Sequence, residues 1–265
     1  MNYGVCLQLA VPMRAADSHA SEMVSQLLFG ETYSILEATR DWLRICTTDC
    51  GYEGWISAKQ HTEMPEAEFS AYEESPRHRV DRTFLYLRDM ATSVIFPIAL
   101  GSQFPLPHDG IFQLGGRTFA VELPEAKPLP RHEGVTEQQE RLLSIAFQYL
   151  NAPYLWGGRT PAGIDCSGFV QNVFACLGIQ LPRDASQQVS NGETVDFIQE
   201  TRIGDVAFFQ NEEGKIVHTG IVCGYQQIIH ASGCVQINTL DETGIFHQGL
   251  RRYTHQLRII KRLLD

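Results

Sequence analysis

The spacing of hydrophobic positions changes part-way along the chain, from a period of two to a period of three to four. Between residues 5 and 11, Val and Leu alternate with polar or small residues, which is typical of a half-buried strand. Further strands are expected over residues 31–37, 42–47 and 54–57, with Gly and polar residues between them. Short strands at this spacing predict a small β-barrel in residues 1–64.

A second group of short strands is expected after an acidic segment. The run of glutamates between Glu63 and Glu74 is most simply a solvated linker. The strands expected beyond it cover residues 83–88, 94–99, 110–114 and 117–121. They predict a second, more divergent barrel in residues 75–125.

The C-terminal part begins with helices and ends with strands. Thr136 followed by Gln139 forms a capping box before a helical stripe that reaches residue 150. A second helix is expected from Cys166 to Leu177, with Gly178 at its end. The strands expected afterwards cover residues 206–209, 216–223, 227–231, 235–239 and 256–262. This order predicts an α+β domain in residues 131–265, after a proline-rich connection at 123–130.

Composition and charge narrow the function classes. The chain has 265 residues with 21 Lys and Arg against 31 Asp and Glu, a formal net charge of −10. An excess of acidic groups argues against binding to nucleic acid or to an anionic membrane, since both need clustered cations. We find no apolar window long enough to span a membrane and no secretory signal pattern, so a cytoplasmic location is expected.

One of the seven cysteines has the surroundings of a nucleophile. The seven contain no CxxC pair, and most are expected to be reduced thiols that fill the core. Cys166 differs because it lies at a predicted helix start between Gly163 and Gly168. Backbone N–H groups there favour negative charge, so we expect a lowered thiol pKa and donors for an oxyanion. The alternative is a cysteine packed under the helix.

Two histidines downstream are candidates for the base that such a thiol needs. His218 interrupts an apolar strand, and His230 lies near the end of the next strand, so adjacent strands can bring their rings together. Either residue can instead be a hydrogen-bonded, half-buried side chain. Zinc coordination by Cys166, His218 and His230 is a further alternative. His247 and His255 are expected at the surface.

Residues 131–265 resemble the NlpC/P60 cysteine peptidases. Five ordered blocks carry the resemblance: residues 153–158 (PYLWGG), 165–170 (DCSGFV), 181–188 (LPRDASQQ), 204–209 (GDVAFF) and 218–221 (HTGI). The blocks 41–45 (DWLRI) and 51–56 (GYEGWI) resemble bacterial SH3 (SH3b) domains. The layout is similar to the YkfC-like γ-D-glutamyl-L-diamino acid endopeptidases, which act on murein peptides. The resemblance implies two SH3-like barrels followed by a papain-like α+β catalytic domain.

The same resemblance implies roles for the catalytic residues. Cys166 matches the nucleophile, His218 the base and His230 the third residue, which orients the base. Tyr154 matches a tyrosine that assists the oxyanion hole beside the Cys166 N–H.

Substrate-binding residues also follow from the resemblance. Asp165 and Ser167 match residues that line the groove, and Asp184 matches an acidic residue near the substrate amine. The resemblance also matches Tyr52 to recognition of a free N-terminal L-Ala. It implies that Trp156 forms a wall of the site and that Glu22 adds a second carboxylate. Tyr52 and Trp156 can also be plain packing, and Asp184 can be a helix N-cap.

The sequence therefore predicts a cysteine endopeptidase. It would hydrolyse the bond between γ-D-Glu and a diamino acid (meso-diaminopimelate or Lys) in free murein peptides, in cell-wall peptide recycling. No cofactor and no metal are expected, and the oligomeric state is left open. A related amidase or acyltransferase, or a murein-binding SH3b protein, are the alternatives.

Overall fold

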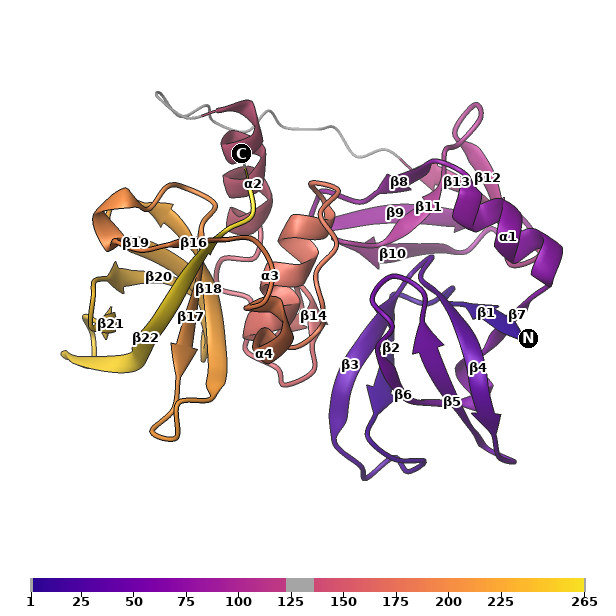
Figure 1. The fold of residues 1–265 in the computed structure, drawn as a ribbon. Helices are drawn as coiled ribbons and strands as arrows, with labels where there is room; N and C mark the ends of the chain where they lie inside the picture. Colours follow the sequence, from indigo (N-terminus) through magenta and orange to yellow (C-terminus); the bar gives the residue numbers. More distant parts are fainter. Residues whose placement is uncertain (1, 123–135, 265) are drawn as a thin grey trace. The chain divides into compact units, whose positions relative to one another are not determined.

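The chain divides into two compact units in a computed structural model that describes residues 2–122 and 136–264 (Figure 1). Unit 1 comprises Met1–Pro128 and Trp156–Pro161, and unit 2 comprises Leu129–Leu155 and Ala162–Asp265. The first two predicted domains therefore belong to one unit, together with a short segment from the third. The predicted proline-rich connection falls mostly outside the described residues.

Unit 1 begins with a curved antiparallel sheet of seven strands, in the order β3-β2-β6-β5-β4-β1-β7. The strands predicted at 31–37, 42–47 and 54–57 are confirmed. The predicted strand at 5–11 is wrong, because the chain between β1 and β2 turns aside to pair with Gly30 and Glu31. The strands are β1 (Tyr3–Val5), β2 (Ala10–Arg14), β3 (Met23–Leu28), β4 (Thr32–Ala38), β5 (Trp42–Thr47), β6 (Glu53–Ser57) and β7 (Thr62–Met64), with the 3-10 turn η1 (Ala58–Gln60).

Inward-facing residues of this sheet form a core of their own, as the period-two pattern predicts. On β5, Leu43 and Ile45 are buried while Arg44 between them is exposed. The cluster contains Cys6, Val11, Met13, Leu27, Tyr33, Leu43, Ile45 and Ile56.

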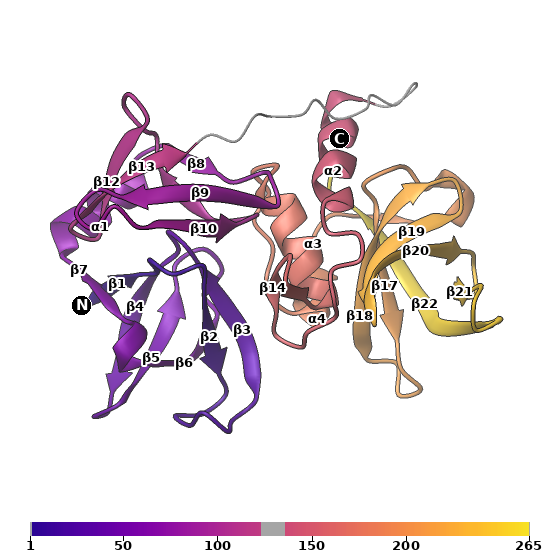
Figure 2. The same ribbon diagram turned by 180° about the vertical axis from the view of Figure 1, so that it is seen from behind.

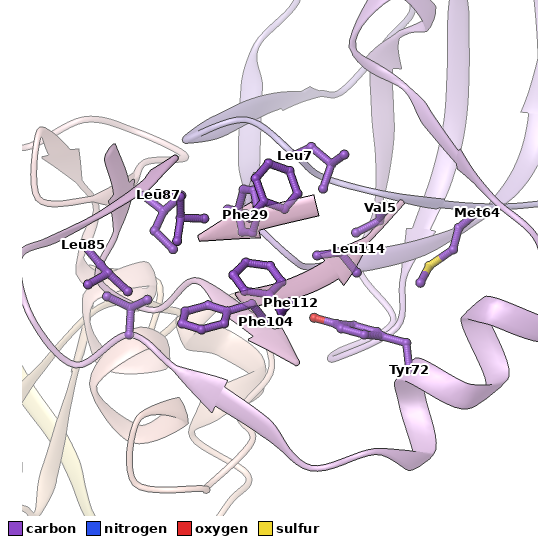
Figure 3. Close-up of a cluster of buried hydrophobic side chains, with 13 residues drawn as sticks. Val5, Leu7, Phe29, Met64, Tyr72, Leu85, Leu87, Phe104, Phe112 and Leu114 are labelled. Atoms are coloured by element: carbon purple, nitrogen blue, oxygen red, sulfur yellow. The ribbon is translucent and has the colours of Figure 1, made fainter. Parts of the chain in front are cut away.

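The second part of unit 1 forms smaller sheets that share a core with the first part. All four strands predicted here are confirmed, within a four-stranded antiparallel sheet ordered β10-β9-β13-β12. Val5, Leu7 and Phe29 of the first part pack among its phenylalanines, with the Phe29 and Phe119 ring centroids 5.5 Å apart (Figure 3). The elements are β8 (Arg77–Arg79), β9 (Phe84–Asp89), β10 (Ile95–Ala99), β11 (Gln103–Pro105), β12 (Ile111–Leu114) and β13 (Arg117–Glu122). The two parts therefore share this hydrophobic core.

The acidic segment between these parts is not the solvated linker that we expected. It contains the helix α1 (Glu66–Glu74), whose Tyr72 is buried in the shared core. The Tyr72 hydroxyl donates a hydrogen bond of 2.8 Å to the carbonyl of Gly30, and Glu68 accepts one of 2.8 Å from the Gly115 N–H. One aromatic residue among many glutamates is enough to anchor the helix.

The predicted helices of unit 2 are confirmed. They are α2 (Glu137–Phe147) and α3 (Cys166–Ala175), followed by the single turn α4 (Ala185–Gln188). Thr136 and Gln139 form the expected capping box on α2. Gly178 follows α3 with φ +83°, a conformation that glycine adopts without strain. Every residue of α3 is buried, so this helix is the centre of unit 2.

A seven-stranded antiparallel sheet makes up the rest of unit 2, in the order β16-β22-β17-β18-β19-β20-β21. An additional pairing between β21 and β22 closes it into a ring (Figure 2). The helix α3 packs on β18 and β19. All five predicted strands are confirmed. The elements are β15 (Gly163–Ile164), β16 (Glu193–Val195), η2 (Ile198–Glu200), β17 (Val206–Gln210), β18 (Ile216–Gly224), β19 (Gln227–Ser232), β20 (Cys234–Leu240), β21 (Gly244–His247) and β22 (Arg252–Arg262); β14 (Arg159–Thr160) belongs to unit 1.

Candidate active site

The predicted nucleophile, Cys166, is the first residue of α3, and the side chain before it starts that helix. Asp165 is the N-cap, and its carboxylate accepts a hydrogen bond of 2.7 Å from the Gly168 N–H. Cys166 itself is 7% exposed. The sequence DCSG therefore places a thiol at a capped helix N-terminus.

A buried arginine holds the residues on either side of Cys166. The Arg183 guanidinium lies 2.5 Å from Asp165 Oδ2 and 3.1 Å from Oδ1 and also donates to Ser167 Oγ at 2.9 Å. Arg183 is 2% exposed, so this ion pair is shielded from water. Asp165 and Ser167 were predicted as groove residues, and both are themselves buried. Sequence reasoning missed Arg183, although it stands in one of the quoted blocks.

The expectation of a lowered thiol pKa at Cys166 is wrong. Burial, followed by the negative charge of Asp165, raises the pKa of this thiol to about 11. The backbone N–H groups of Thr219 and Ser167 and the charge of Arg183 act in the opposite direction but do not outweigh burial. Since the thiol is neutral at pH 7, forming the thiolate requires a base. Thr219, the residue after His218, brings that base's strand beside the sulfur.

The two predicted histidines meet across adjacent strands. His218 on β18 and His230 on β19 are 5% and 1% exposed, and His218 Nε2 lies 2.8 Å from His230 Nδ1. Gly220 leaves room for this contact, because a Cβ there would lie 2.7 Å from the Cβ of His230. The predicted pairing of these residues is confirmed.

Asn238 on β20 extends this pair into a chain of three polar side chains across β18, β19 and β20. Its Nδ2 lies 3.1 Å from His230 Nε2, and Asn238 is 8% exposed. The sequence analysis did not single out Asn238. The one feature that could have indicated its role is that it is a polar residue inside the strand expected at 235–239.

The Asn238 amide decides which nitrogen of His218 carries the proton. Rotation of the amide by 180° presents either Nδ2 or Oδ1 to His230. If Oδ1 accepts from His230 Nε2–H, then His230 Nδ1 accepts from His218 Nε2–H, and His218 Nδ1 keeps a lone pair. The opposite orientation places the proton of His218 on Nδ1. Only the first arrangement leaves a nitrogen that can act as a base.

Three histidines, not two, gather among the described residues of unit 2. His255 on β22 was expected at the surface, but it is half-buried, and its ring stacks on His218 with centroids 4.0 Å apart. Closure of the sheet through β22 brings it there, and no local pattern predicts that closure. Burial lowers the pKa of all three: well below 6.5 for His218, where His255 and His230 add to the effect, and to about 3 for His230. All three are neutral at pH 7.

Tyr154 and Asp184 occupy defined positions in unit 2. Burial, followed by the negative charges of the Cys166 thiolate form and of Asp165, raises the pKa of Tyr154, so its hydroxyl keeps its proton at pH 7. Asp184 is at the N-cap of α4, but its side chain makes no capping hydrogen bond. Asp184 therefore has the N-cap position that the alternative interpretation expected, but without a capping hydrogen bond from its side chain.

The other predicted substrate residues belong to unit 1. Trp156 is 59% exposed, and its Nε1 donates a hydrogen bond of 2.6 Å to Glu22 Oε1. Tyr52 is half-buried and packs against the core of the first sheet.

The segment Trp156–Pro161 is anchored within unit 1 by close backbone packing and by a buried ion pair. Gly157 has φ +74°, and a Cβ there would lie 2.5 Å from the carbonyl oxygen of Met23. Two residues later, Arg159 binds both carboxylate oxygens of Glu31 at 2.8 Å. This segment separates Tyr154 from Cys166 in the sequence.

Comparison with known proteins agrees with both parts of the sequence resemblance. The model of the NlpC/P60 family matches residues 151–253, and that of the bacterial dipeptidyl-peptidase SH3 domain matches residues 13–60. A γ-D-glutamyl-L-lysine dipeptidyl-peptidase of Bacillus cereus is 26% identical over 261 residues, covering 89% of this chain and 77% of the relative. Its namesake from Bacillus subtilis is 28% identical over 236 residues, covering 83% and 76%.

A solved structure has a similar fold over the same length. The crystal structure of an NlpC/P60 family protein from Bacillus cereus has a TM-score of 0.81 at 19% identity and covers 99% of this chain and 100% of that chain. The chain thus combines a peptidase domain that has a cysteine nucleophile with a bacterial SH3 domain. Residues 151–253 belong to the NlpC/P60 family of cysteine peptidases. None of the helices in residues 2–122 and 136–264 has the length and hydrophobicity that a membrane span needs.

Proposed function

We propose that this protein is a cysteine endopeptidase that hydrolyses the bond between γ-D-Glu and an L-diamino acid in murein peptides with a free N-terminal L-Ala. The observation that carries the proposal is the buried chain from His218 through His230 to Asn238 beside a helix that begins with Cys166. The names of the two Bacillus relatives support the choice of bond. The diamino acid is Lys or meso-diaminopimelate.

In the first half of the reaction, His218 Nδ1 takes the thiol proton as Cys166 Sγ attacks the γ-carbonyl carbon. Transfer occurs together with attack because the thiol is neutral beforehand. The oxyanion of the tetrahedral intermediate accepts hydrogen bonds from the Cys166 N–H and the Tyr154 hydroxyl. The His218 imidazolium then protonates the leaving α-amine of the diamino acid, which leaves an L-Ala-γ-D-Glu thioester on Cys166.

In the second half, His218 acts as a base for water. Water attacks the thioester carbonyl and loses a proton to His218, which returns it to the departing Cys166 sulfur. The products are L-Ala-D-Glu and the diamino acid with whatever follows it. His230 keeps the ring of His218 oriented through both halves, and Asn238 keeps His230 in the required tautomer.

Recognition of the free amine is part of the same proposal. An alanyl ammonium removed from water needs a carboxylate, otherwise desolvation is costly. We assign Asp184 this role, with Asp165 and Ser167 lining the groove; Tyr52 and Trp156 keep the substrate-binding roles that the sequence resemblance implies. Glu22, which accepts the Trp156 indole hydrogen bond, orients that ring. The proposal also includes the domain layout: two SH3-like barrels at 1–64 and 75–125, followed by a papain-like domain at 131–265. The enzyme would act in the cytoplasm, in the recycling of murein peptides.

The test uses the full chain and three synthetic peptides. Wild-type protein should release L-Ala-D-Glu from L-Ala-γ-D-Glu-L-Lys and from the diaminopimelate analogue, as read by product mass, whereas Cys166→Ala should release none. N-acetylation of the alanine should abolish cleavage if the free amine is recognised. Undiminished hydrolysis by Cys166→Ala would contradict the proposal. Cleavage of a different amide or ester bond would favour the alternative that the protein is an amidase or acyltransferase.

A further inference from the structure

We propose that His218, His230 and His255 form a binding site for Zn²⁺, and that the bound ion blocks the base of the active site. One ligand nitrogen from each of the three histidines lies within 4.8 Å of the others. They come from three strands, β18, β19 and β22, and the closed sheet holds them together. The inhibitory effect rests on the proposed function, whereas binding of the ion does not.

The state of the three rings suits a metal ion. An imidazole binds metal through a lone pair and therefore has to be neutral. His218 Nε2 and His230 Nδ1 lie 2.8 Å apart in a hydrogen bond, so at least one of these two nitrogens holds a lone pair.

The donor set selects the kind of ion. The group consists of three imidazoles, with no carboxylate or thiolate among the described residues that join it. Imidazole donors favour Zn²⁺, Cu²⁺ and Ni²⁺, whereas Mg²⁺ and Ca²⁺ prefer oxygen. A tetrahedral Zn²⁺ with bonds of about 2.0–2.1 Å needs its nitrogens roughly 3.3 Å apart, so the most distant pair has to close by about 1.5 Å. Rotations about side-chain torsions supply shifts of this size, and His255 is only half-buried.

Metal binding requires the tautomer that prevents catalysis. His218 Nε2 and His230 Nδ1 face each other at 2.8 Å, and one of them carries the proton between them. For both nitrogens to bind one ion, that proton has to leave, so His218 carries its proton on Nδ1 and His230 carries its proton on Nε2. No proton is lost overall. With Nδ1 protonated and Nε2 on the metal, His218 has no lone pair to accept the proton of Cys166.

The test measures metal binding in the full chain with Cys166→Ala, which removes the nucleophilic thiol and any hydrolysis. Co²⁺ is the spectroscopic probe, since its visible bands become intense in a four-coordinate site, and Zn²⁺ is then used to displace it. We expect one Co²⁺ per chain, displaced by Zn²⁺, with no sulfur charge-transfer band in the near ultraviolet. Adding His255→Gln should weaken binding at least about tenfold.

His247→Gln is the matched control. His247 is a half-buried histidine on β21, the strand that pairs with β22, and it lies outside the three-histidine group. In the Cys166→Ala background it should leave metal affinity within about twofold of its parent. His255→Asn serves as a second replacement, and the thermal unfolding midpoint of each variant shows that it is folded.

The outcomes separate this proposal from the proposed function. Absence of Co²⁺ uptake by the Cys166→Ala protein, a sulfur charge-transfer band, or an affinity unchanged from that parent in both folded His255 variants would overturn the metal site. Zn²⁺ should also inhibit peptide hydrolysis by wild-type protein, and inhibition should need more Zn²⁺ in His255→Gln. If no peptide is hydrolysed at all, the proposed function fails while the binding result stands.

Discussion

Arg159 and Glu31 form a two-pronged ion pair inside unit 1, with both guanidinium-to-carboxylate distances at 2.8 Å. Their side chains are 8% and 4% exposed. Glu31 also accepts a hydrogen bond from the Leu28 N–H, and Arg159 donates to the carbonyl of Gln26. The pair thus fastens the segment between Tyr154 and Cys166 to the first sheet.

Glu31→Gln should strongly destabilise unit 1. The substitution leaves a buried guanidinium without its counter-charge, which costs roughly 3–5 kcal/mol of unfolding free energy. All three tryptophans, Trp42, Trp55 and Trp156, belong to unit 1, so tryptophan fluorescence during urea denaturation of the full chain reports on this unit.

The control for this experiment is Glu53→Gln. Glu53 pairs with Arg44 at 2.6 Å, but the two side chains are 48% and 45% exposed. Removal of such a surface pair changes stability by less than about 1 kcal/mol. Equal shifts of the urea midpoint in the two variants would contradict the structural role of the Arg159–Glu31 pair.

Asn238→Leu should lower kcat at least about tenfold with little change in KM. Leucine has no acceptor for His230 Nε2–H, so the tautomer that keeps a lone pair on His218 Nδ1 loses its support. Asn238→Asp keeps an acceptor of similar size and should retain most of the activity. Steady-state kinetics on the tripeptide would show this split, and equal losses in both variants would argue for a packing role instead.

The sequence predicts those parts of the site that depend on local pattern. Asp165, Cys166 and Gly168 lie within one helix start, and the capping that places the thiol is contained in these residues. His218 and His230 lie on consecutive strands, so their pairing also follows from short-range pattern. Strand positions were predicted well for the same reason. The strand predicted at 5–11 was wrong, several strands of two to four residues were not predicted, and β3 was missed because Ser25 and Gln26 interrupt its apolar alternation.

Features that depend on long-range closure or on burial could not be predicted. His255 reaches His218 because β22 pairs with both β17 and β21, which no local window contains. The thiol pKa depends on how deeply Cys166 is enclosed, and a helix N-terminus alone predicts the opposite direction. The helix around Tyr72 was not predicted because the segment has the composition of a solvated linker. Burial of this one aromatic side chain in the shared core is what keeps the segment packed.

Alkylation of Cys166 by iodoacetamide should accelerate steadily with pH above neutrality. Because the pKa of the thiol is raised to about 11, the thiolate fraction grows about tenfold per pH unit below that value. The rate would be measured between pH 6 and 10 by mass spectrometry of the peptide containing Cys166, with Cys166→Ala identifying that peptide. A rate that is already constant at pH 6–8 would instead indicate a preformed thiolate–imidazolium pair.

Unit 2 should lose stability in acid, and His230 should account for part of the loss. The pKa of His230 is about 3 in the folded chain against an ordinary value of 6.5. Between these values the unfolded chain binds a proton that the folded chain does not. The unfolding free energy therefore falls as pH drops below about 6.5, by up to about 1.4 kcal/mol per unit for this residue. His218 and His255 act in the same direction, since their pKa values are also lowered.

His230→Gln isolates the contribution of that one proton. Urea denaturation of the full chain at pH 5, 6 and 7 would be followed by far-ultraviolet circular dichroism for both units and by tryptophan fluorescence for unit 1 alone. The dichroism transition assigned to unit 2 should depend less steeply on pH in the variant, while the fluorescence transition keeps the wild-type pH dependence. If the unfolding free energy of unit 2 depended on pH in the same way in wild type and His230→Gln, His230 would take up a proton equally in the folded and unfolded chain. That result would contradict its burial at 1% exposure.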